Sequence, residues 1–309
     1  MSSILVIGGA GFIGSHLTEL LAAKGHKVAV IDNLYLGTED NLKKIKAKIK
    51  LHNINFNDKE KVEAILKENK IEYVFHFGGY SSAPMFDKNE AEAFKDAVGF
   101  VNLLDACVKQ KVKRVLYASS SSIYGDVKPQ REDIKVMPPN FYSLTKFTME
   151  HAARLFYDNY KLESIGFRFF SVYGKNERHK KQYANLISQF LWAIQEDKDV
   201  VVYGDGLQTR DFTYVLDLCN ALIKGMETKS ENAKANVYNI GTSETYTINE
   251  MIVILEKLTH KKAKRKYIAN PIKNYVQDTK ADTAKIKKEL GFEAKFSLVD
   301  GIKDILKVY

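Results

Sequence analysis

The chain has 309 residues, of which 45% are hydrophobic and 28% are charged, and this composition is typical of a globular protein rather than a disordered one. The 47 basic and 38 acidic residues give a formal charge of +9, which suits an anionic small substrate. The sequence has no apolar run of about 18 residues and the apolar run after Ser3 is too short for a signal peptide, so we expect a cytoplasmic protein with no membrane span.

The first half of the chain alternates short β-rich runs with helical patterns, as a parallel sheet covered by helices requires. Strands are predicted over Ile4–Ile7, Val28–Ile31, Tyr73–Phe77, Arg114–Ala118 and Ser164–Phe169. Helices are predicted over Phe12–Lys24, Lys59–Asn69, Ala91–Lys109 and Phe141–Tyr160. We therefore expect an α/β fold with a doubly wound parallel sheet of the Rossmann type.

The second half of the chain is less regular. Helices are predicted over Tyr183–Ile194, Val215–Met226 and Ile248–Leu258, strands over Val200–Tyr203 and Val237–Ile240, and helix alternating with turn from Ala281 onwards. We expect a boundary near Ser171 that separates a Rossmann domain, residues 1–170, from a smaller α/β lobe in residues 171–309. Part of the segment from about 204 to 240 is expected to return to the first domain.

Two features of the composition carry no function in this interpretation. The lysine-rich run Lys261–Lys266 is not interleaved with aromatic residues and no nucleic-acid module is present, so we interpret it as a solvated surface. Cys107 and Cys219 are far apart in apolar helical patterns, which favours buried hydrophobic side chains over a metal site. We expect neither a nucleic-acid partner nor a metal.

A glycine-rich turn follows the first predicted strand. Gly9–Gly14 has the spacing G-x-G-x-x-G, and Gly8 precedes it. Such glycines let the backbone approach a pyrophosphate, while the N-terminus of the following helix supplies free N–H groups and partial positive charge. The second strand ends at Asp32, whose carboxylate can accept hydrogen bonds from a ribose diol and repels a 2′-phosphate. The turn therefore predicts NAD rather than NADP, a preference that Lys43 and Lys44 could soften.

A second motif places a tyrosine and a lysine on one helix. Tyr142 and Lys146 are four residues apart, so both side chains lie on the same face. A phenol with a pKa of about 10 is a poor base at neutral pH, but a neighbouring ammonium and an oxidised nicotinamide both favour the phenolate. Lowering the pKa by about 3 units requires roughly 4 kcal/mol, which two close cations can supply in a dry site. The pair predicts proton transfer beside a nicotinamide.

A run of serines strengthens this interpretation. Ser119–Ser122 follow the strand predicted over Arg114–Ala118, and open parallel sheets bind ligands at the carboxyl ends of their strands. Hydroxyl groups at this edge can bind a substrate oxygen and share a proton with the tyrosine. The alternative for such a run is a polar turn without a ligand.

Together these motifs resemble the extended short-chain dehydrogenase/reductase family, which contains sugar-nucleotide epimerases and dehydratases. The resemblance runs along almost the whole chain. It rests on Gly8–Leu17, Asp32–Leu34, Phe75–Gly79, Ser119–Gly125, Tyr142–Lys146, Arg168–Gly174, Gly204–Gly206, Arg210–Phe212, Tyr238–Gly241, Ala281–Asp282 and Leu290–Phe292. It implies an NAD-dependent enzyme whose smaller lobe binds a nucleotide-sugar substrate.

The resemblance also implies roles for individual residues. Ser120, Tyr142 and Lys146 would form the catalytic trio. The implied cofactor contacts are Gly8, Gly11, Phe12, Ile13, Gly14, Asp32, Asn33, Asn53, Ile54, Phe77, Gly78, Gly79, Ser119, Tyr142 and Lys146. The implied substrate contacts are Ser81, Ser82, Ser120, Ser121, Tyr142, Ser171, Lys180, Arg210 and Tyr275, of which Arg210 would bind the diphosphate.

Some positions depart from the family pattern. Ser171 and Asp96 stand where asparagine is usual, and Gly78–Gly79 replaces a common pair of alanines. The dehydratases of the family carry acidic residues just after the catalytic hydroxyl, and the related decarboxylases tend to have a glutamate there. This chain has Ser121 and Ser122 instead. The pattern favours epimerisation, which needs only hydride and proton shuttling.

The sequence indicates the sugar substrate less specifically than it indicates the family. A UDP-glucose/UDP-galactose 4-epimerase is the favoured activity because it is the commonest member of the group. Val172–Lys180 and Tyr275–Asp282, however, are similar to segments of ADP-heptose 6-epimerases, in which the lysine matching Lys180 lies in the active site. A 6-epimerase of that type, or another sugar-nucleotide oxidoreductase, is the alternative enzyme.

Two further expectations concern partners. A non-catalytic protein that senses NAD(H) is the alternative outside the enzymes, but it would be expected to have lost Tyr142 or Lys146. The resemblance implies a homodimer, joined through the helices predicted over Ala91–Lys109 and Phe141–Tyr160.

Overall fold

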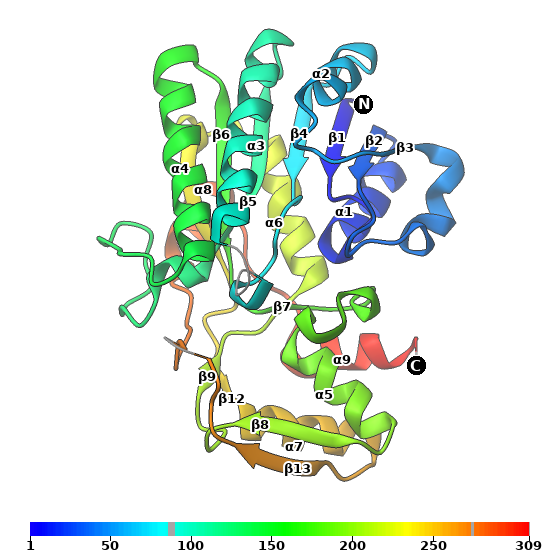
Figure 1. Cartoon of the computed structure of the whole chain (residues 1–309), viewed down its shortest axis with the longest axis vertical. Coiled ribbons are helices and arrows are strands. Elements are labelled where there is room, and N and C mark those ends of the chain that lie inside the picture. Colours follow the sequence, from blue (N-terminus) through cyan, green and yellow to red (C-terminus); the bar gives the residue numbers. More distant parts are fainter. Residues whose placement is uncertain (86–89, 273–274, 309) are drawn as a thin grey trace.

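A computed structural model describes residues 1–85, 90–272 and 275–308. Its largest element is a seven-stranded parallel sheet with the strand order β11-β6-β5-β4-β1-β2-β3 (Figure 1). The strands are β1 (Ser3–Ile7), β2 (Lys27–Asp32), β3 (Ile49–Asn53), β4 (Tyr73–His76), β5 (Arg114–Ser120), β6 (Glu163–Phe169) and β11 (Ala235–Ile240). The predicted doubly wound parallel sheet is confirmed, and its order reverses between β1 and β4, where such sheets bind ligands.

Helices cover both faces of this sheet because its strands are apolar on both sides. Along β1, Ile4 and Val6 belong to one hydrophobic core, whereas Leu5 and Ile7 belong to the other. The first core packs against α1 (Phe12–Ala23) and α6 (Val215–Glu227), and the second packs against α2 (Lys59–Glu68), α3 (Glu90–Lys109) and α4 (Phe141–Tyr160). The continuous apolar runs of the sequence therefore correspond to strands buried on both faces.

The start of α4 is set by a capping box. The Asn140 side chain accepts a hydrogen bond from the Ser143 backbone N–H, and the Ser143 hydroxyl accepts one from the Asn140 N–H. This cap places Tyr142 in the first turn of the helix, at the end that faces the carboxyl edge of the sheet, and Lys146 one turn further on.

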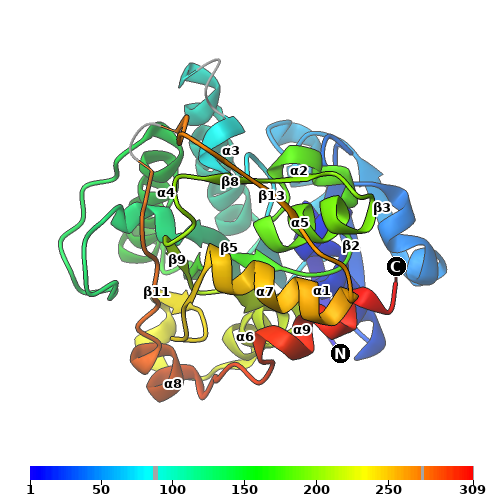
Figure 2. The same ribbon diagram turned by 90° about the horizontal axis from the view of Figure 1, so that it is seen from below.

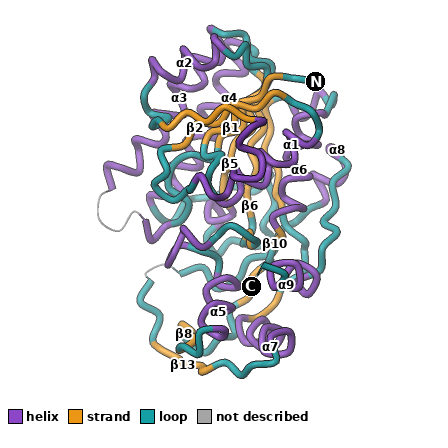
Figure 3. The backbone as a smooth tube through the Cα atoms, turned by 90° about the vertical axis from the view of Figure 1, so that its right-hand side faces the viewer, coloured by secondary structure: helices purple, strands orange, loops and turns teal. Residues whose placement is uncertain are grey.

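A smaller lobe lies beyond the carboxyl ends of the large sheet (Figures 1 and 3). It contains the parallel strands β8 (Asp199–Tyr203) and β13 (Lys264–Ile268). Helices α5 (Leu186–Gln195) and α7 (Ile248–Thr259) pack against each other beside these strands, and α9 (Leu298–Leu306) packs on α7 (Figure 2). The second half of the chain also returns to the large sheet, because β11 pairs with β6 along its whole length.

Short elements connect these parts. They are η1 (Glu39–Lys48), η2 (Ala83–Met85), η3 (Ser121–Tyr124), β7 (Val172–Tyr173), η4 (Arg178–Tyr183), β9 (Thr209–Arg210), β10 (Thr213–Tyr214), η5 (Glu231–Ala233), β12 (Tyr246–Thr247) and α8 (Ala284–Leu290). Within the described ranges, no helix has the length and apolar character required to cross a membrane.

Helix α5 and the strands β3 and β13 are among the elements that differ from the predictions. The helix predicted from Tyr183 begins at Leu186, because Ala184 and Asn185 are extended and the Asn185 side chain accepts a hydrogen bond from the Ile187 N–H. Strand β3 was not predicted, and it lies at the sheet edge with a mixed polar sequence. Strand β13 was not predicted either, because the lysines in it keep its surface exposed even though its backbone pairs with β8.

Candidate active site

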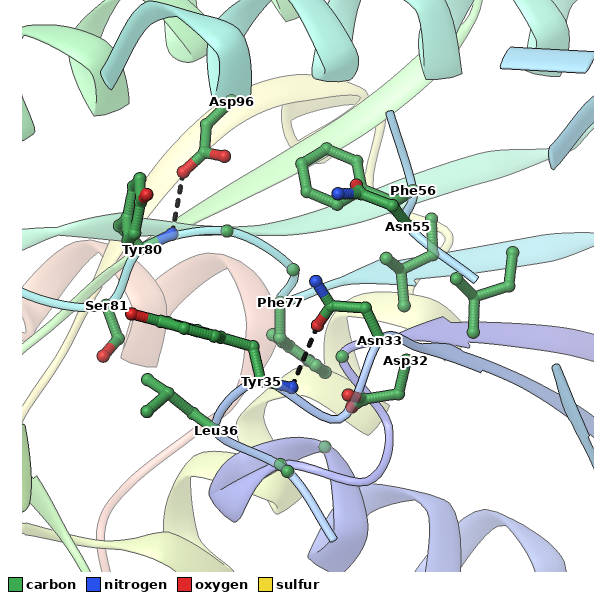
Figure 4. Close-up of a pocket in the computed structure, with 18 of the residues that line it drawn as sticks. Asp32, Asn33, Tyr35, Leu36, Asn55, Phe56, Phe77, Tyr80, Ser81 and Asp96 are labelled. Carbon is green, nitrogen blue, oxygen red and sulfur yellow. Dashed lines mark hydrogen bonds between the residues drawn. The ribbon is translucent and has the colours of Figure 1, made fainter. Parts of the chain in front are cut away.

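A cavity of about 300 Å³ opens at the carboxyl ends of β1, β2 and β4, where the strand order of the sheet reverses (Figure 4). Its walls come from the turns after these strands and after β3, from α3 and from η4. Of the predicted site residues, the following line it: Gly8, Gly11, Phe12, Ile13, Gly14, Asp32, Asn33, Ile54, Phe77, Gly78, Gly79, Ser81 and Lys180. The structure thus brings together segments that are up to about 170 residues apart in the chain.

The glycine-rich turn forms a cradle that side chains would close. A Cβ atom on Gly14 would lie 2.1 Å from the carbonyl oxygen of Gly8, and Gly8 itself has a φ of +77°. Helix α1 begins directly after the turn, and within the described residues no side chain caps its N-terminus. The first N–H groups of α1 therefore point toward the cavity wall, and the cradle fits a pyrophosphate.

The carboxylate of Asp32 is held against this turn. It accepts hydrogen bonds from the backbone N–H groups of Ala10, at 2.9 Å, and Leu34, at 2.8 Å. Burial raises the pKa of Asp32, and the backbone hydrogen bonds from Leu34 and Ala10 oppose that rise. A carboxylate has about four lone-pair positions, so the two backbone donors leave acceptor capacity for a ribose diol.

The turn after β3 forms another wall of the cavity. Ile54 and the residue after it, Asn55, line the cavity, whereas Asn53 is not among the lining residues within the described ranges. Tyr35 and Leu36 also line it, and the Tyr35 side chain extends toward Ser81 in Figure 4. Sequence reasoning missed Tyr35, Leu36 and Asn55, and a prediction of β3 would have directed attention to Asn55.

The predicted catalytic pair lies next to the cavity. Tyr142 and Lys146 are 8% and 5% exposed, and the Lys146 ammonium lies 5.8 Å from the centre of the Tyr142 ring. The Tyr142 hydroxyl donates a hydrogen bond to the Ser81 carbonyl oxygen at 3.2 Å, and it also hydrogen-bonds to the Ser120 hydroxyl. In the part of the chain that the structure describes, Lys146 has no hydrogen bond or ion pair within 4.0 Å.

The protonation of this pair depends on its surroundings. Burial raises the pKa of the Tyr142 phenol, Ser120 lowers it through a hydrogen bond, and the charge of Asp96 raises it. Burial lowers the pKa of Lys146, and Asp96 opposes that effect. The phenol is thus neutral at physiological pH in the surroundings that the protein itself provides, and an additional positive charge near the ring is required to make it a base.

The serines after β5 point in different directions. The Ser120 hydroxyl forms hydrogen bonds with the Tyr142 hydroxyl and with the Ser122 hydroxyl, and the two serine oxygens are 2.8 Å apart. Ser119 turns the other way and donates a hydrogen bond to the buried carboxylate of Glu150. Ser82, on the segment after β4, has a buried hydroxyl with no hydrogen-bond partner among the described residues.

The remaining predicted substrate residues lie outside this cavity or at its rim. The Arg210 guanidinium stacks 4.9 Å from the centre of the Tyr275 ring and donates hydrogen bonds to the carbonyl oxygens of Thr209, Val276 and Gln277. Arg210 and Tyr275, both of which the resemblance implies as substrate contacts, are therefore neighbours in the structure. Ser171 lies between β6 and β7, and neither it nor Ser121 lines the cavity within the described ranges.

Lys180, on η4, lines the cavity and lies over the ring of Phe12, the first residue of α1. Its ammonium is 5.4 Å from the ring centre and has no carboxylate within 4.0 Å in the described ranges. Burial lowers the pKa of Lys180, and the charge of Glu177 opposes this. Glu177 is itself buried, and it fixes the loop by accepting hydrogen bonds from the N–H groups of Gly174 and Asn185.

Comparison with known proteins finds similar sequences along nearly the whole chain. A sequence model of the family described as "NAD dependent epimerase/dehydratase family" matches residues 4–241. The UDP-N-acetyl-alpha-D-glucosaminuronate decarboxylase of Bacillus cytotoxicus is 30% identical over 318 residues, and the alignment covers 98% of this chain and 96% of that protein.

Solved structures extend the similarity to the complete fold. The UDP-glucose 4-epimerase of Thermotoga maritima, determined with UDP-glucose, has a TM-score of 0.89 and 28% identity, with 99% of this chain and 97% of that chain covered. The UDP-glucuronic acid 4-epimerase of Bacillus cereus, in complex with UDP-glucuronic acid and NAD, has a TM-score of 0.90 and 27% identity, with 99% and 100% covered. Both share the arrangement of large sheet and smaller lobe over nearly their whole length.

Proposed function

Because the chain belongs to the NAD dependent epimerase/dehydratase family, we propose that it is a UDP-sugar 4-epimerase that interconverts UDP-glucose and UDP-galactose through a transient keto sugar. The observation that carries this proposal is the meeting of Tyr142 with Ser120 and Lys146 beside the cavity that the glycine-rich turn lines. The 4-epimerases among the structural relatives, one of them determined with UDP-glucose and one with UDP-glucuronic acid and NAD, support the same assignment.

The chain's own residues suit NAD. The Gly8–Gly14 cradle and the N-terminus of α1 would hold the pyrophosphate, and Asp32 would accept hydrogen bonds from the adenosine ribose. Lys146, whose ammonium has no ion pair in the described part of the chain, would bind on the nicotinamide side. When bound, NAD supplies a reversible hydride acceptor, so a sugar carbon can be oxidised and then reduced without net redox change.

The proton transfer is assigned to Tyr142. Its hydroxyl forms hydrogen bonds with the Ser81 carbonyl oxygen and with the Ser120 hydroxyl. A sugar hydroxyl that takes the place of the Ser81 carbonyl as the partner of Tyr142 would therefore join a hydrogen-bond relay with Ser120. The Lys146 ammonium stabilises the phenolate, which accepts the sugar's proton as the carbon is oxidised and returns it when the opposite epimer forms. Rotation of the keto sugar between the two steps inverts the configuration.

The smaller lobe would hold the nucleotide. We assign the diphosphate to Arg210, whose guanidinium is oriented by three carbonyl oxygens and by Tyr275, and the sugar to Ser81, Ser82, Ser121, Ser171 and Lys180. The Ser82 hydroxyl, which has no hydrogen-bond partner among the described residues, and the Lys180 ammonium are suited to sugar oxygens. Residues 1–170, with part of 204–240, would then bind the cofactor, and the rest of 171–309 would bind the substrate.

The test is a product analysis of the purified protein. We expect UDP-galactose to be converted to UDP-glucose without accumulation of NADH, because the cofactor is regenerated in each turnover. UDP-glucuronate and ADP-heptose, assayed in parallel, separate this activity from those of the hexuronate enzymes and the 6-epimerases. Stoichiometric NADH or release of CO₂ would replace the proposal with a dehydrogenase or a decarboxylase.

We further propose a homodimer formed by α3 and α4. The outer face of these helices exposes Val98 and Val101 on α3 and Leu155 on α4. Phe94 and Phe141 join the two helices at this face, with ring centres 6.2 Å apart. Exposed apolar side chains gathered on one face of α3 and α4 suit an interface in which these two helices pack against the same two helices of a second copy. Light scattering of a Val98→Glu/Leu155→Glu protein should report a monomer, whereas an unchanged dimer would place the interface elsewhere.

A further inference from the structure

A carboxylate reaches the cavity from α3. Asp96 is 7% exposed, lines the cavity and accepts a hydrogen bond from the Tyr80 backbone N–H at 2.7 Å (Figure 4). Its position is unusual, because a buried negative charge beside a proton-transferring phenol opposes ionisation of that phenol. Asp96 belongs neither to the proposed cofactor cradle nor to the proposed proton relay.

The backbone is shaped to receive this carboxylate. Gly79 has a φ of +100°, and a Cβ atom there would lie 2.4 Å from the Asp96 Oδ2 atom. Asp96 thus occupies the space that a side chain at position 79 would need. The glycine at position 79 and the aspartate at position 96, two of the departures from the family pattern, form a single packed unit.

This unit is connected to the catalytic tyrosine through two consecutive residues. The N–H of Tyr80 is held by Asp96, and the carbonyl of the next residue, Ser81, accepts the hydrogen bond of the Tyr142 hydroxyl. The carboxylate therefore fixes the backbone that meets the phenol. Its charge also acts directly, because it raises the pKa of Tyr142 and opposes the burial that lowers the pKa of Lys146.

We propose that Asp96 is a positioning residue of the catalytic pair, which fixes the Tyr80–Ser81 backbone with its carboxylate and places a negative charge beside Lys146. The inference rests on the proposed function, since it treats Tyr142 as the group that exchanges a proton with the sugar. It makes a prediction about pH: with the charge of Asp96 present, the phenolate forms at a higher pH than it would beside a neutral residue.

The other titratable groups around the pair do not reproduce this charge. His76, on β4, is fully enclosed, and burial together with Lys146 lowers its pKa to about 3, so it is neutral. The Glu150 and Arg168 side chains form a buried ion pair and largely cancel each other. Among the residues that the structure describes, the remaining charged groups that line the cavity are Lys95 beside Asp96, Lys180 on η4, and Asp32, which lies across the cavity from Asp96 in Figure 4.

The sign of the expected effect follows from Coulomb's law. Replacing Asp96 by asparagine keeps an oxygen that can accept the Tyr80 N–H but removes the negative charge. Ionisation of the Tyr142 phenol is then less unfavourable, so the titration midpoint of this phenol should fall by about one pH unit. Asp96→Ala removes both the charge and the acceptor, so it should produce the same fall and also loosen the backbone at Ser81.

The decisive measurement uses the NAD-loaded protein without substrate. The ultraviolet absorbance of the Tyr142 phenolate is followed with pH as the difference between each protein and its Tyr142→Phe counterpart. We expect the midpoint to move down in Asp96→Asn and to stay in place in Asp105→Asn. Asp105 is a matched control, because it lies on the same helix and pairs with Lys59 and Lys109 at the surface. Equal midpoints in the wild-type and Asp96→Asn proteins would overturn the proposed role of the charge.

A second measurement links the residue to turnover. The acid limb of the pH profile of kcat/KM for UDP-galactose should shift down by about one unit in Asp96→Asn, with KM near that of the wild type. Asp96→Ala should show the same shift with a KM raised several-fold, and recovery of KM in the Asn protein would separate positioning from charge. A KM raised equally in both variants would overturn the role of the hydrogen bond. If no protein converts UDP-galactose, the proposed substrate fails, while the phenolate titration still decides the role of Asp96.

Discussion

The large sheet and the smaller lobe present their functional residues in different ways. At the edge of the sheet, the cradle directly precedes helix α1, Asp32 ends strand β2, and Tyr142 and Lys146 lie in the first turns of α4. In the lobe, Arg210 is oriented by the carbonyl oxygens of residues 276 and 277, more than sixty positions further along the chain. The groups assigned to the chemistry are thus carried by a strand end and by one helix, whereas Arg210 lies in a two-residue strand and is oriented by a segment far along the chain.

The largest expected effect lies on the side of the chemistry. Tyr142→Phe removes the group assigned to proton transfer, so kcat should fall by about 10³-fold or more, while NAD binding and the unfolding transition remain close to those of the wild type. Steady-state kinetics and NAD titration measure the two quantities. Tyr157→Phe, on the same helix, is the control and should be fully active. Near-normal turnover in the Tyr142→Phe protein would remove this residue from the mechanism.

A smaller effect of a different kind is expected in the lobe. Arg210→Ala removes a cation assigned to the diphosphate, and the lost charge-assisted hydrogen bonds correspond to about 2 kcal/mol, or roughly 30-fold in KM. Because the proton-transfer groups are untouched, kcat should change little. Arg178→Ala is the matched control, since Arg178 lies in an exposed ion pair with Glu196 over the Trp192 ring. A fall in kcat with constant KM would show that Arg210 acts in the chemical step rather than in substrate binding.

The buried imidazole of His76 leads to a prediction about the free energy of unfolding rather than about activity. Burial lowers its pKa from 6.5 to about 3, so the unfolded chain binds a proton between these values and the folded protein does not. Stability therefore falls as the pH drops below 6.5, by about 2 kcal/mol at pH 5 relative to pH 7.

In a His76→Phe protein this loss should disappear, because the ring packs between Phe56 and Phe100 without a titrating group. Urea unfolding at the two pH values measures it. An identical pH dependence in the wild-type and His76→Phe proteins would assign the acid sensitivity to other groups.

The smallest effect is expected at the outer strand of the lobe. Lys264→Ala in β13 breaks an ion pair with Asp197 whose partners are 55% and 78% exposed, and such surface pairs contribute about 0.5 kcal/mol or less. The melting temperature should change by no more than about 1 °C. A larger change, measured by calorimetry, would mean that the lysine-rich strand stabilises the lobe more than its exposure suggests.

The same contrast explains what the sequence could predict. The glycine spacing, the carboxylate eighteen residues after Gly14 and the Tyr142–Lys146 spacing each describe one local element, and the structure brings these elements to one edge of the sheet. The hydrogen bond from the Tyr80 N–H to Asp96 joins a loop to a helix 16 residues further along the chain, so no local sequence pattern predicts it. Strand β13 was missed because its lysines point to solvent and leave no alternation to detect.

The position of β11 has a consequence for how the chain is made. Strand β6 is complete at residue 169, but its outer edge is paired only when residues 235–240 have been added. During synthesis the ribosome therefore carries a nascent sheet with an open, largely apolar border while about seventy further residues are translated. Such a border can pair with other nascent chains, so fragments that stop short of β11 should need chaperones to stay in solution.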